Sequence, residues 1–198
     1  MATAEIHLKT GDSPFTADPA QSFTLPARFY TDESVYALEQ EAIFYNSWWY
    51  AGHVSQLQKT GDYLTTEIHE QSVFVVRDRD GDLRAFYNVC QHRGHELVNG
   101  SGHANLIVCP YHAWSYDLDG QLKGARNTEN MEGFKKCDFA LKPVQVEVLC
   151  GLVMINLNLQ AKPLKELAPG LEDEIKQYCP SVDNLVFAQR DTYEVPCN

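Results

Sequence analysis

Two short segments, each pairing one cysteine with one histidine, constrain this chain more than any other feature. The first reads Cys90-Gln91-His92-Arg93-Gly94 and the second reads Cys109-Pro110-Tyr111-His112, with sixteen residues between His92 and Cys109. Each segment directly follows a β-like run, so both are expected at the tips of hairpins. Two such tips brought together would supply two sulfurs and two nitrogens to one small site.

Two kinds of metal centre accept two thiolates and two imidazoles. Zinc binds such a set tetrahedrally, but its usual spacing pairs cysteine with cysteine and histidine with histidine. A Rieske-type [2Fe–2S] cluster has two cysteines on one iron and two histidines on the other, and a loop that carries one of each can reach both irons. The mixed segments therefore favour the cluster over zinc, and over four unligated core residues.

Length and composition allow one domain with appendages. The chain has 198 residues, of which 44% are apolar, so a sizeable core is possible. Its 16 basic and 27 acidic residues give a formal charge of −11. This balance disfavours nucleic acid and anionic membrane as partners, since both require clustered basic residues. A cationic substrate or a basic redox partner suits it better, although solubility alone also explains the charge.

Nothing in the sequence indicates export or membrane insertion. Residues 1–12 are polar and contain no hydrophobic signal core. The longest apolar stretch, residues 148–155, is far shorter than the ~18 residues that a membrane span needs. The chain is therefore predicted to be cytoplasmic, where cysteines near histidines more often bind metal than form disulfides. The other cysteines, Cys137, Cys150, Cys179 and Cys197, are expected to be buried as small hydrophobes.

The coarse pattern is helical at first and then mostly β. Residues 1–25 read as a loose arm, and a helix capped by Thr31 is predicted over residues 32–45. One face of that helix is expected in a core, because Val35, Leu38, Ala42 and Tyr45 have helical spacing. Short β-like runs with Asp-Gly turns then predict an antiparallel sandwich or barrel. The predicted strands cover residues 63–68, 72–77, 83–89, 106–108, 113–118, 141–148, 151–157 and 185–195, and a second helix covers 171–178.

The two segments also match a longer pattern, C-x-H-R-G, a spacer and C-x-Y-H-x-W, which ends here at Trp114. In this pattern the chain resembles the N-terminal part of the large subunit of Rieske non-haem iron oxygenases, the aromatic-ring-hydroxylating superfamily. The resemblance runs from about Phe29 to the C-terminus. It implies a mostly β fold, a Rieske [2Fe–2S] antiparallel β-sandwich with two hairpin cluster-binding loops and flanking helices.

The resemblance also implies roles for individual residues. Cys90 and Cys109 would bind the inner iron, and His92 and His112 the outer iron. His112 would be the electron exit, hydrogen-bonded to a carboxylate in the catalytic domain of a neighbouring subunit. Three further residues are expected around the cluster: Arg93 to orient the loop or to remain solvated, Tyr111 beside its histidine, and Trp114 as a shield against water.

Two details of the sequence indicate a branch of this family and the reduction potential of the cluster. Many family members have glycine after the last histidine, where this chain has Ala113. Together with the residues around both segments, this looks most like the branch that acts on quaternary ammonium compounds such as carnitine and glycine betaine. Respiratory Rieske proteins carry an extra cysteine in each loop and a serine that donates to the cluster, which this chain lacks. Fewer hydrogen bonds to sulfur predict a potential near the low end of about −150 to +300 mV.

In the family, oxygenation takes place at a mononuclear Fe(II) held by two histidines and a carboxylate in a second domain. No such set is recognisable here, so the chain alone is expected to lack the catalytic iron site. The predicted division is an arm and helix (1–46), a Rieske domain (47–158), and a linker into a catalytic domain (159–198).

The predicted function is electron transfer within an oxygenase. The resemblance implies a separate flavin- or ferredoxin-type reductase that uses NAD(P)H to supply the electrons, and subunits that form a homotrimeric ring. The alternative is a free-standing Rieske ferredoxin, a carrier without catalytic activity. The N-terminal helix and residues 159–198 exceed what a ferredoxin needs and favour the oxygenase.

Overall fold

The computed structural model describes residues 16, 18–22, 24–128 and 130–196. These residues fall into two compact units, each described here by itself. The larger unit covers residues 43–191, and the smaller one contains the described residues before 43 and after 191. Most of the predicted arm, residues 1–15, 17 and 23, lies outside the described residues. The boundaries predicted at residues 46 and 158 stay predictions.

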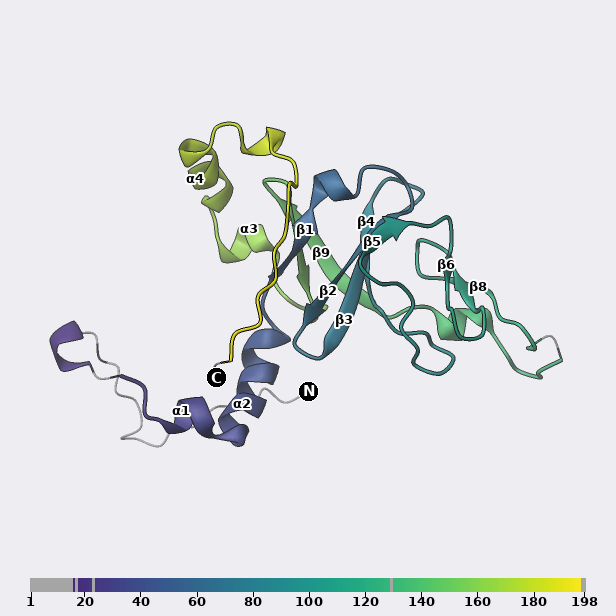
Figure 1. Cartoon of the computed structure of the whole chain (residues 1–198), viewed down its shortest axis with the longest axis horizontal. Coiled ribbons are helices and arrows are strands. Elements are labelled where there is room, and N and C mark those ends of the chain that lie inside the picture. The colour runs from purple at the N-terminus through teal and green to yellow at the C-terminus, as the bar shows by residue number, and fades with distance from the viewer. Residues whose placement is uncertain (1–15, 17, 23, 129, 197–198) are drawn as a thin grey trace. The chain divides into compact units, whose positions relative to one another are not determined.

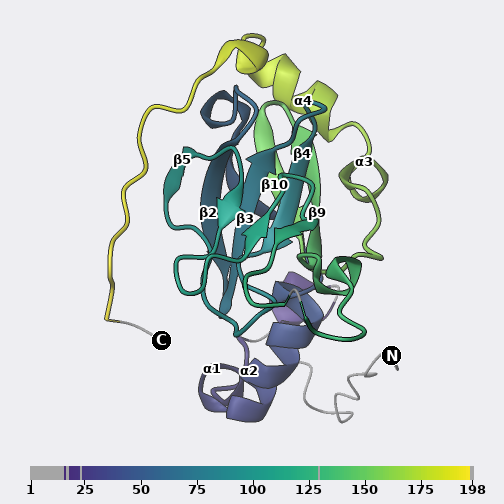
Figure 2. The same ribbon diagram turned by 90° about the vertical axis from the view of Figure 1, so that its right-hand side faces the viewer.

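Within the described residues, the larger unit is built on two antiparallel sheets (Figure 1). Seven strands form a sheet in the order β1-β10-β9-β4-β3-β2-β5, and it curls so that its first strand contacts β2. A smaller sheet, β6-β7-β8, lies in front of it in Figure 2. The mostly β fold is thereby confirmed. The strands are β1 Trp49–His53, β2 Asp62–Ile68, β3 Gln71–Arg77, β4 Leu83–Tyr87, β5 Ser101–His103, β6 Ile107–Val108, β7 Ser115–Tyr116, β8 Leu122–Gly124, β9 Pro143–Leu149 and β10 Leu152–Asn156.

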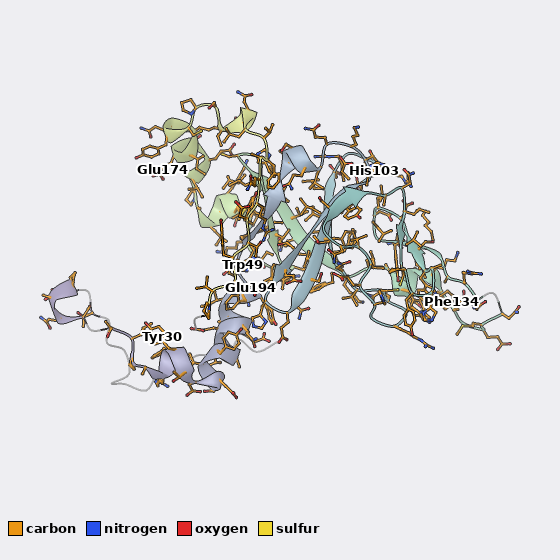
Figure 3. All side chains as sticks on the ribbon, viewed as in Figure 1. Tyr30, Trp49, His103, Phe134, Glu174 and Glu194 are labelled. Atoms are coloured by element: carbon orange, nitrogen blue, oxygen red, sulfur yellow. The ribbon has the colours of Figure 1, made fainter. Side chains whose placement is uncertain are left out.

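Strand β3 separates two hydrophobic cores. Phe74 and Val76 face the first core, which also contains Trp114 of the second cysteine–histidine segment. Val73 and Val75 face the second core, inside the curl of the large sheet. A strand buried on both faces reads as a continuous apolar run, which is why residues 72–77 lack polar alternation. Side chains from both sheets fill the interior (Figure 3), and the cysteine–histidine segments are seated on the first core.

The turn between β3 and β4 is held by one carboxylate. Asp78, 2% exposed, accepts hydrogen bonds from the amides of Asp80 (3.0 Å) and Asp82 (2.9 Å) and from Arg84 Nε (2.7 Å). Gly81 supplies the left-handed backbone, with φ +87°, that the predicted Asp-Gly turn requires. Burial alone would raise the pKa of Asp78, but the hydrogen bonds from Arg84 and the two amides outweigh it and lower that pKa.

The N-terminal helix differs from its prediction. A short helix α1 (Arg28–Thr31) ends at the predicted cap, and α2 (Glu33–Glu39) is capped by Asp32, whose carboxylate accepts from Ser34 N at 2.8 Å. The helix then widens into a π-helical turn over Gln40–Phe44. No residue of α2 is buried, and of the predicted core-facing residues Tyr45, which follows the helical turns, packs partly buried against the second core. Helical spacing marks a face that can pack, but it does not supply the partner.

The C-terminal part of the larger unit is helical and then irregular. Helix α4 spans Leu171–Tyr178 as predicted, and a short α3 (Leu164–Leu167) precedes it. The strand predicted over residues 185–195 is wrong, because this segment pairs with no strand of either sheet. Apolar and β-branched side chains there, such as Val186 at 69% exposure, stay in solvent. The 3₁₀ turns are Pro19–Gln21, Val54–Gln56, Lys136–Phe139 and Val182–Asn184.

Several strand boundaries also shift inward by one or two residues. The clearest case is β7, predicted from residue 113 but beginning at Ser115, because Ala113 has φ +57° and cannot join a strand. No helix among the described residues is long and apolar enough to cross a bilayer.

We predict that Asp78→Ala destabilises the fold by about 1–2 kcal/mol at pH 7, because two amides and Arg84 lose their acceptor. The pKa of Asp78 is lowered in the folded state, so its contribution is present above the ordinary carboxyl pKa and fades as the pH falls through the folded value. Urea unfolding at pH 7 and below pH 4 measures both effects. The control is Asp80→Ala on the same turn, whose exposed side chain should matter by less than about 0.5 kcal/mol. Equal losses in the two variants would contradict the assignment.

Candidate metal centre

The first cysteine–histidine segment forms a tight loop between β4 and β5, which do not pair with each other, so the hairpin predicted for this segment is wrong. The amide of Cys90 donates to the carbonyl of His95 (2.8 Å), and the amide of Gly94 donates back to the carbonyl of Cys90 (2.9 Å). Gly94 has φ +69°, a left-handed conformation that glycine adopts without steric cost. The loop therefore closes on the backbone of its own cysteine, with His92 at its tip.

The second segment, between β6 and β7, repeats this hydrogen-bond frame. The amide of Cys109 donates to the carbonyl of Trp114 (2.8 Å), and the amide of Ala113 donates to the carbonyl of Cys109 (3.0 Å). Ala113 occupies the left-handed position with φ +57°, as Gly94 does in the first loop. The frame explains why glycine suits this place, since an L-residue with a Cβ is strained there. The two loops thus hold their cysteines in the same backbone setting.

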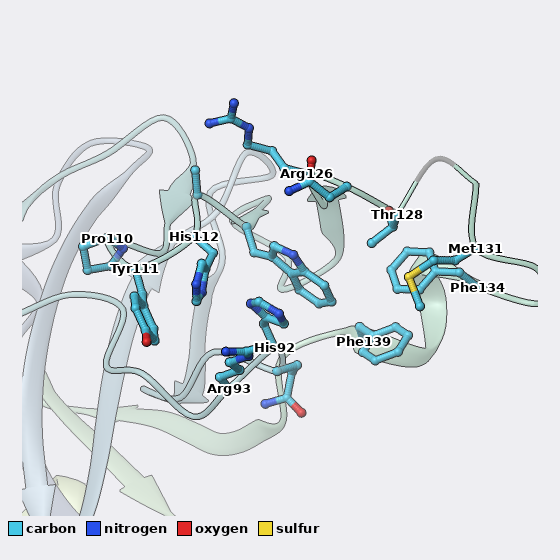
Figure 4. A pocket seen from close by; sticks show the side chains of 14 residues that line it. His92, Arg93, Pro110, Tyr111, His112, Arg126, Thr128, Met131, Phe134 and Phe139 are labelled. Carbon is cyan, nitrogen blue, oxygen red and sulfur yellow. The ribbon is translucent and has the colours of Figure 1, made fainter.

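The two histidines meet at the loop tips (Figure 4). The ring centroids of His92 and His112 lie 4.7 Å apart at an interplanar angle of 71°. Each ring buries its Nδ1 atom, and neither Nδ1 has a hydrogen-bond partner among the described residues. A buried polar atom without a partner is costly, and an ion is one of the few things that satisfies it. Both nitrogens are therefore suited to bind a metal.

The two cysteine thiols lie beneath the histidines. Cys90 and Cys109 are each 2% exposed, and both are free. Burial raises the pKa of the Cys90 thiol, and contact with Cys109 raises it further, while Tyr116 and the amide of His92 act in the opposite direction. Two adjacent buried thiols ionise readily only when a cation lies beside them. The predicted ligands are thus brought together, with sulfurs inside and imidazoles outside.

This arrangement fits a binuclear iron–sulfur cluster. In the described part of the chain, no three histidine, cysteine or acidic side chains converge on a point where they could hold a single metal ion. A Rieske cluster requires only two protein ligands on each iron. Two inner thiols and two outer imidazoles with buried, unsatisfied Nδ1 atoms match that requirement.

The surroundings of the two histidines differ. The indole of Trp114, 4% exposed, stacks on His92 at 4.8 Å and 12°, and it also contacts the rings of Phe134 and Phe139 edge-on. Burial lowers the pKa of His92, and the nearby charges of His112 and Arg93 lower it further. This favours the neutral imidazole, the form that binds metal. Trp114 thereby covers one side of the site, as the predicted shield would.

The side of His112 is more open. Its ring lies 3.8 Å from that of Tyr111, which is 56% exposed and also approaches His95 at 5.5 Å. Both histidines border a cavity of about 800 Å³ that reaches Arg126 and Met131 (Figure 4). Arg93 lines the same cavity and is exposed, and within the described residues it donates no hydrogen bond to a carbonyl. The predicted loop-orienting role of Arg93 is therefore not seen, whereas the solvated alternative is.

Tyr116 is a residue of this site that sequence reasoning missed. It is fully buried on β7, and its hydroxyl accepts a hydrogen bond from Gln91 N (3.0 Å) and lies 3.3 Å from Cys90 Sγ. An amide can only donate, so the hydroxyl proton is available to the sulfur. Burial raises the pKa of Tyr116, and the bond to Cys90 raises it further, which keeps that proton in place. The only sequence feature that could have indicated this role is a tyrosine on the strand that follows the second loop.

The cysteines outside the two loops were expected to be buried. Cys150 is buried, Cys179 is half-buried and Cys137 is exposed, so the expectation is wrong for Cys137. Cys137 belongs to a surface 3₁₀ turn, where short-range geometry and not hydrophobicity places it. Cys197 lies outside the described residues.

Comparisons with known proteins agree with this geometry. Residues 47–138 match the model of the Rieske [2Fe-2S] domain. The carnitine monooxygenase oxygenase subunit of Escherichia coli (strain K12) is 45% identical over 185 residues, which cover 93% of this chain and 50% of that protein. This chain contains a Rieske [2Fe-2S] domain and is homologous to Rieske oxygenase subunits. The chain spans about half the length of the curated relatives it matches.

More distant relatives extend the same comparison. The glycine betaine monooxygenase oxygenase subunit of Pseudomonas aeruginosa (strain PAO1) is 34% identical over 178 residues, covering 89% of this chain and 41% of the relative. The crystal structure of the quaternary ammonium Rieske monooxygenase CntA with L-carnitine superposes with a TM-score of 0.85 at 42% identity, over 89% of this chain and 51% of CntA. Naphthalene 1,2-dioxygenase from Rhodococcus sp. gives 0.71 at 30%, over 77% and 36%. These similarities favour an oxygenase component over a free ferredoxin.

We predict that Tyr116→Phe lowers the reduction potential of the cluster-loaded protein. A hydrogen bond to sulfur stabilises the more negative, reduced cluster, and about 1 kcal/mol of added strength on reduction corresponds to roughly 40 mV for one electron. Redox titration followed by EPR measures the shift. Tyr111→Phe makes the same chemical change on an exposed ring and should leave the potential nearly unchanged. A lower potential in Tyr111→Phe alone would refute the role of Tyr116.

We also predict that Ala113→Gly stabilises the fold by up to about 1 kcal/mol. The substitution removes left-handed strain from an L-residue, partly offset by the extra freedom of glycine in the unfolded chain. The control is Ala140→Gly, because Ala140 has φ −63° and gains nothing from glycine. Urea unfolding of the two variants should give changes of opposite sign. A destabilised Ala113→Gly protein would show that the Cβ makes contacts that outweigh the strain.

Proposed function

We propose that this chain holds a Rieske [2Fe–2S] cluster through Cys90, Cys109, His92 and His112 and passes single electrons within an oxygenase. The observation that carries the proposal is the pair of buried, unpartnered Nδ1 atoms directly outside two buried thiols. When bound, the cluster supplies a one-electron redox centre. The Rieske [2Fe-2S] domain match and the similarity to Rieske oxygenase subunits support the same assignment.

The protein residues have separate tasks in this proposal. Cys90 and Cys109 anchor the inner iron in a dry setting, where thiolate charge is balanced by metal. His92 and His112 bind the outer iron through Nδ1 in their neutral form. Tyr116 donates to the sulfur of Cys90, which partly offsets the low potential expected when few hydrogen bonds reach the cluster.

We propose His112 as the electron exit. Its ring is covered by the exposed Tyr111, whereas His92 is stacked against the buried Trp114. A ring that binds iron through Nδ1 leaves Nε2 available, and on the open side this nitrogen can donate to a partner's carboxylate. The open side of the site therefore favours His112 over His92 as the outlet.

The remaining assignments concern the whole oxygenase, and the relatives, which are named oxygenase subunits, support a reductase partner and an assembly of several subunits. We propose a mononuclear Fe(II) site in a catalytic domain, a separate reductase that draws on NAD(P)H, a ring of three subunits and a cytoplasmic location. Quaternary ammonium compounds are the proposed substrate class, because the carnitine and glycine betaine monooxygenase subunits are among the relatives with 34–45% identity. The charge of −11 is compatible with a cationic substrate.

Cluster analysis of the purified protein tests the ligand assignment. We predict two irons and two acid-labile sulfides per chain, and a Rieske EPR signal with average g below two after reduction. Cys109→Ser and His112→Ala should each abolish this signal, because an iron loses one of its two protein ligands. The matched controls are Cys137→Ser and His103→Ala, exposed residues away from the loops, which should retain it. A colourless zinc protein, or full cluster content in Cys109→Ser, would overturn the proposal.

A further inference from the structure

One buried amide joins the two ends of the first cluster loop. Asn88, 1% exposed, follows β4, and its Oδ1 accepts hydrogen bonds from the amides of Leu97 and Val98, both at 3.1 Å. Its Nδ2 donates to the carbonyl of Val98 at 2.7 Å, to Glu96 at 3.1 Å and to Ser72 Oγ at 3.2 Å. The side chain thus spans the loop from the residue before it to the residues that follow it.

The backbone of Asn88 is also fixed. Its amide donates to the carbonyl of Ser72 on the neighbouring strand β3 at 2.9 Å. The loop is therefore clasped to β3, the strand that separates the two cores. Between the two sides of this clasp lie both ligands of the first loop, Cys90 and His92. Ser72 Oγ also reaches both sides, through the side chains of Asn88 (3.2 Å) and Glu96 (3.3 Å), whereas Asn88 bonds to the backbone beyond the loop.

Asparagine is the side chain that this clasp requires. Oδ1 accepts from two amides while Nδ2 donates to a carbonyl, and an aspartate of the same shape cannot donate. In Asn88→Asp, the carbonyl of Val98 would lose its donor, and a negative charge would face the carboxylate of Glu96. The substitution therefore opens the clasp without removing side-chain volume.

We infer that Asn88 is a positioning residue for the cluster, setting the place of Cys90 and His92 relative to the second loop. This inference rests on the proposed function, because it takes these two side chains as ligands. The second loop needs no such clasp, since it directly joins two paired strands, β6 and β7. The first loop runs from β4 to β5 without a direct pairing of those strands, so a side chain has to close it.

A second buried asparagine provides a matched control. Asn156 on β10 is fully buried, accepts from Asn158 N at 2.9 Å and donates to the carbonyl of Asn46 at 3.1 Å. None of these three residues belongs to the cluster loops. Asn156→Asp thus introduces the same buried charge and the same loss of a donor at a different place in the sheet.

The experiment compares Asn88→Asp with Asn156→Asp in the cluster-loaded protein. Loss of cluster to a chelator should become at least about fivefold faster in Asn88→Asp, and the EPR g-values of its remaining cluster should shift. Asn156→Asp should lower the melting temperature but leave both cluster readouts as in the wild type. Equal acceleration in both variants, or unchanged g-values and lifetime in Asn88→Asp, overturns the inference.

Hydrogen exchange keeps the test decisive if Asn88→Asp does not fold. The amides of Leu97 and Val98 should be strongly protected in the wild-type protein, because both are bonded to a buried oxygen. Exchange as fast as in an exposed loop would overturn the clasp. A wild-type protein without iron and sulfide would instead overturn the proposed function, so the two failures are distinguishable.

Discussion

The structure depends on one constraint: two thiols must be kept dry while two imidazoles on the same loops remain only half-buried. The first core keeps the thiols dry, because Phe74 and Phe86 of the large sheet and Tyr116 of the small sheet pack around the cysteines. Strand β3 gives this core a rigid base, because its opposite face is buried in the second core. A loop packed on such a base can hold its metal-binding side chains in fixed positions.

The two loops share the same backbone hydrogen-bond arrangement but build it from different residues. In both, the cysteine amide and carbonyl are bonded within the loop, and a left-handed residue closes it. The histidine falls two residues after the cysteine in the first loop and three after it in the second. The frame can therefore be shared while the rings approach from different directions, at an angle of 71°. Similar loops with offset histidines are a simple way to place four ligands around two metal ions.

Local patterns predicted much of this. The ligand candidates, the apolar run of β3 and helix α4 are encoded within a few residues of sequence, and each is found where it was expected. Asn88 and Tyr116 could not be recognised, because their roles depend on partners up to 26 residues away, brought close only by the fold. The strand predicted over 185–195 was wrong for the same reason: β propensity is local, but a strand exists only with a partner to share its hydrogen bonds.

The two histidine rings are packed against different neighbours, so the two sides of the site are not equivalent. Trp114 covers one face of the His92 ring with a buried indole that itself packs against Phe134 and Phe139. Tyr111 covers His112 with a ring that is more than half exposed, and such a ring can be displaced or contacted by a docking protein. If both rings bind one cluster, as proposed, this difference would not change how electrons are stored. It would affect only where electrons leave, and a protein that delivers electrons to one place needs this kind of asymmetry.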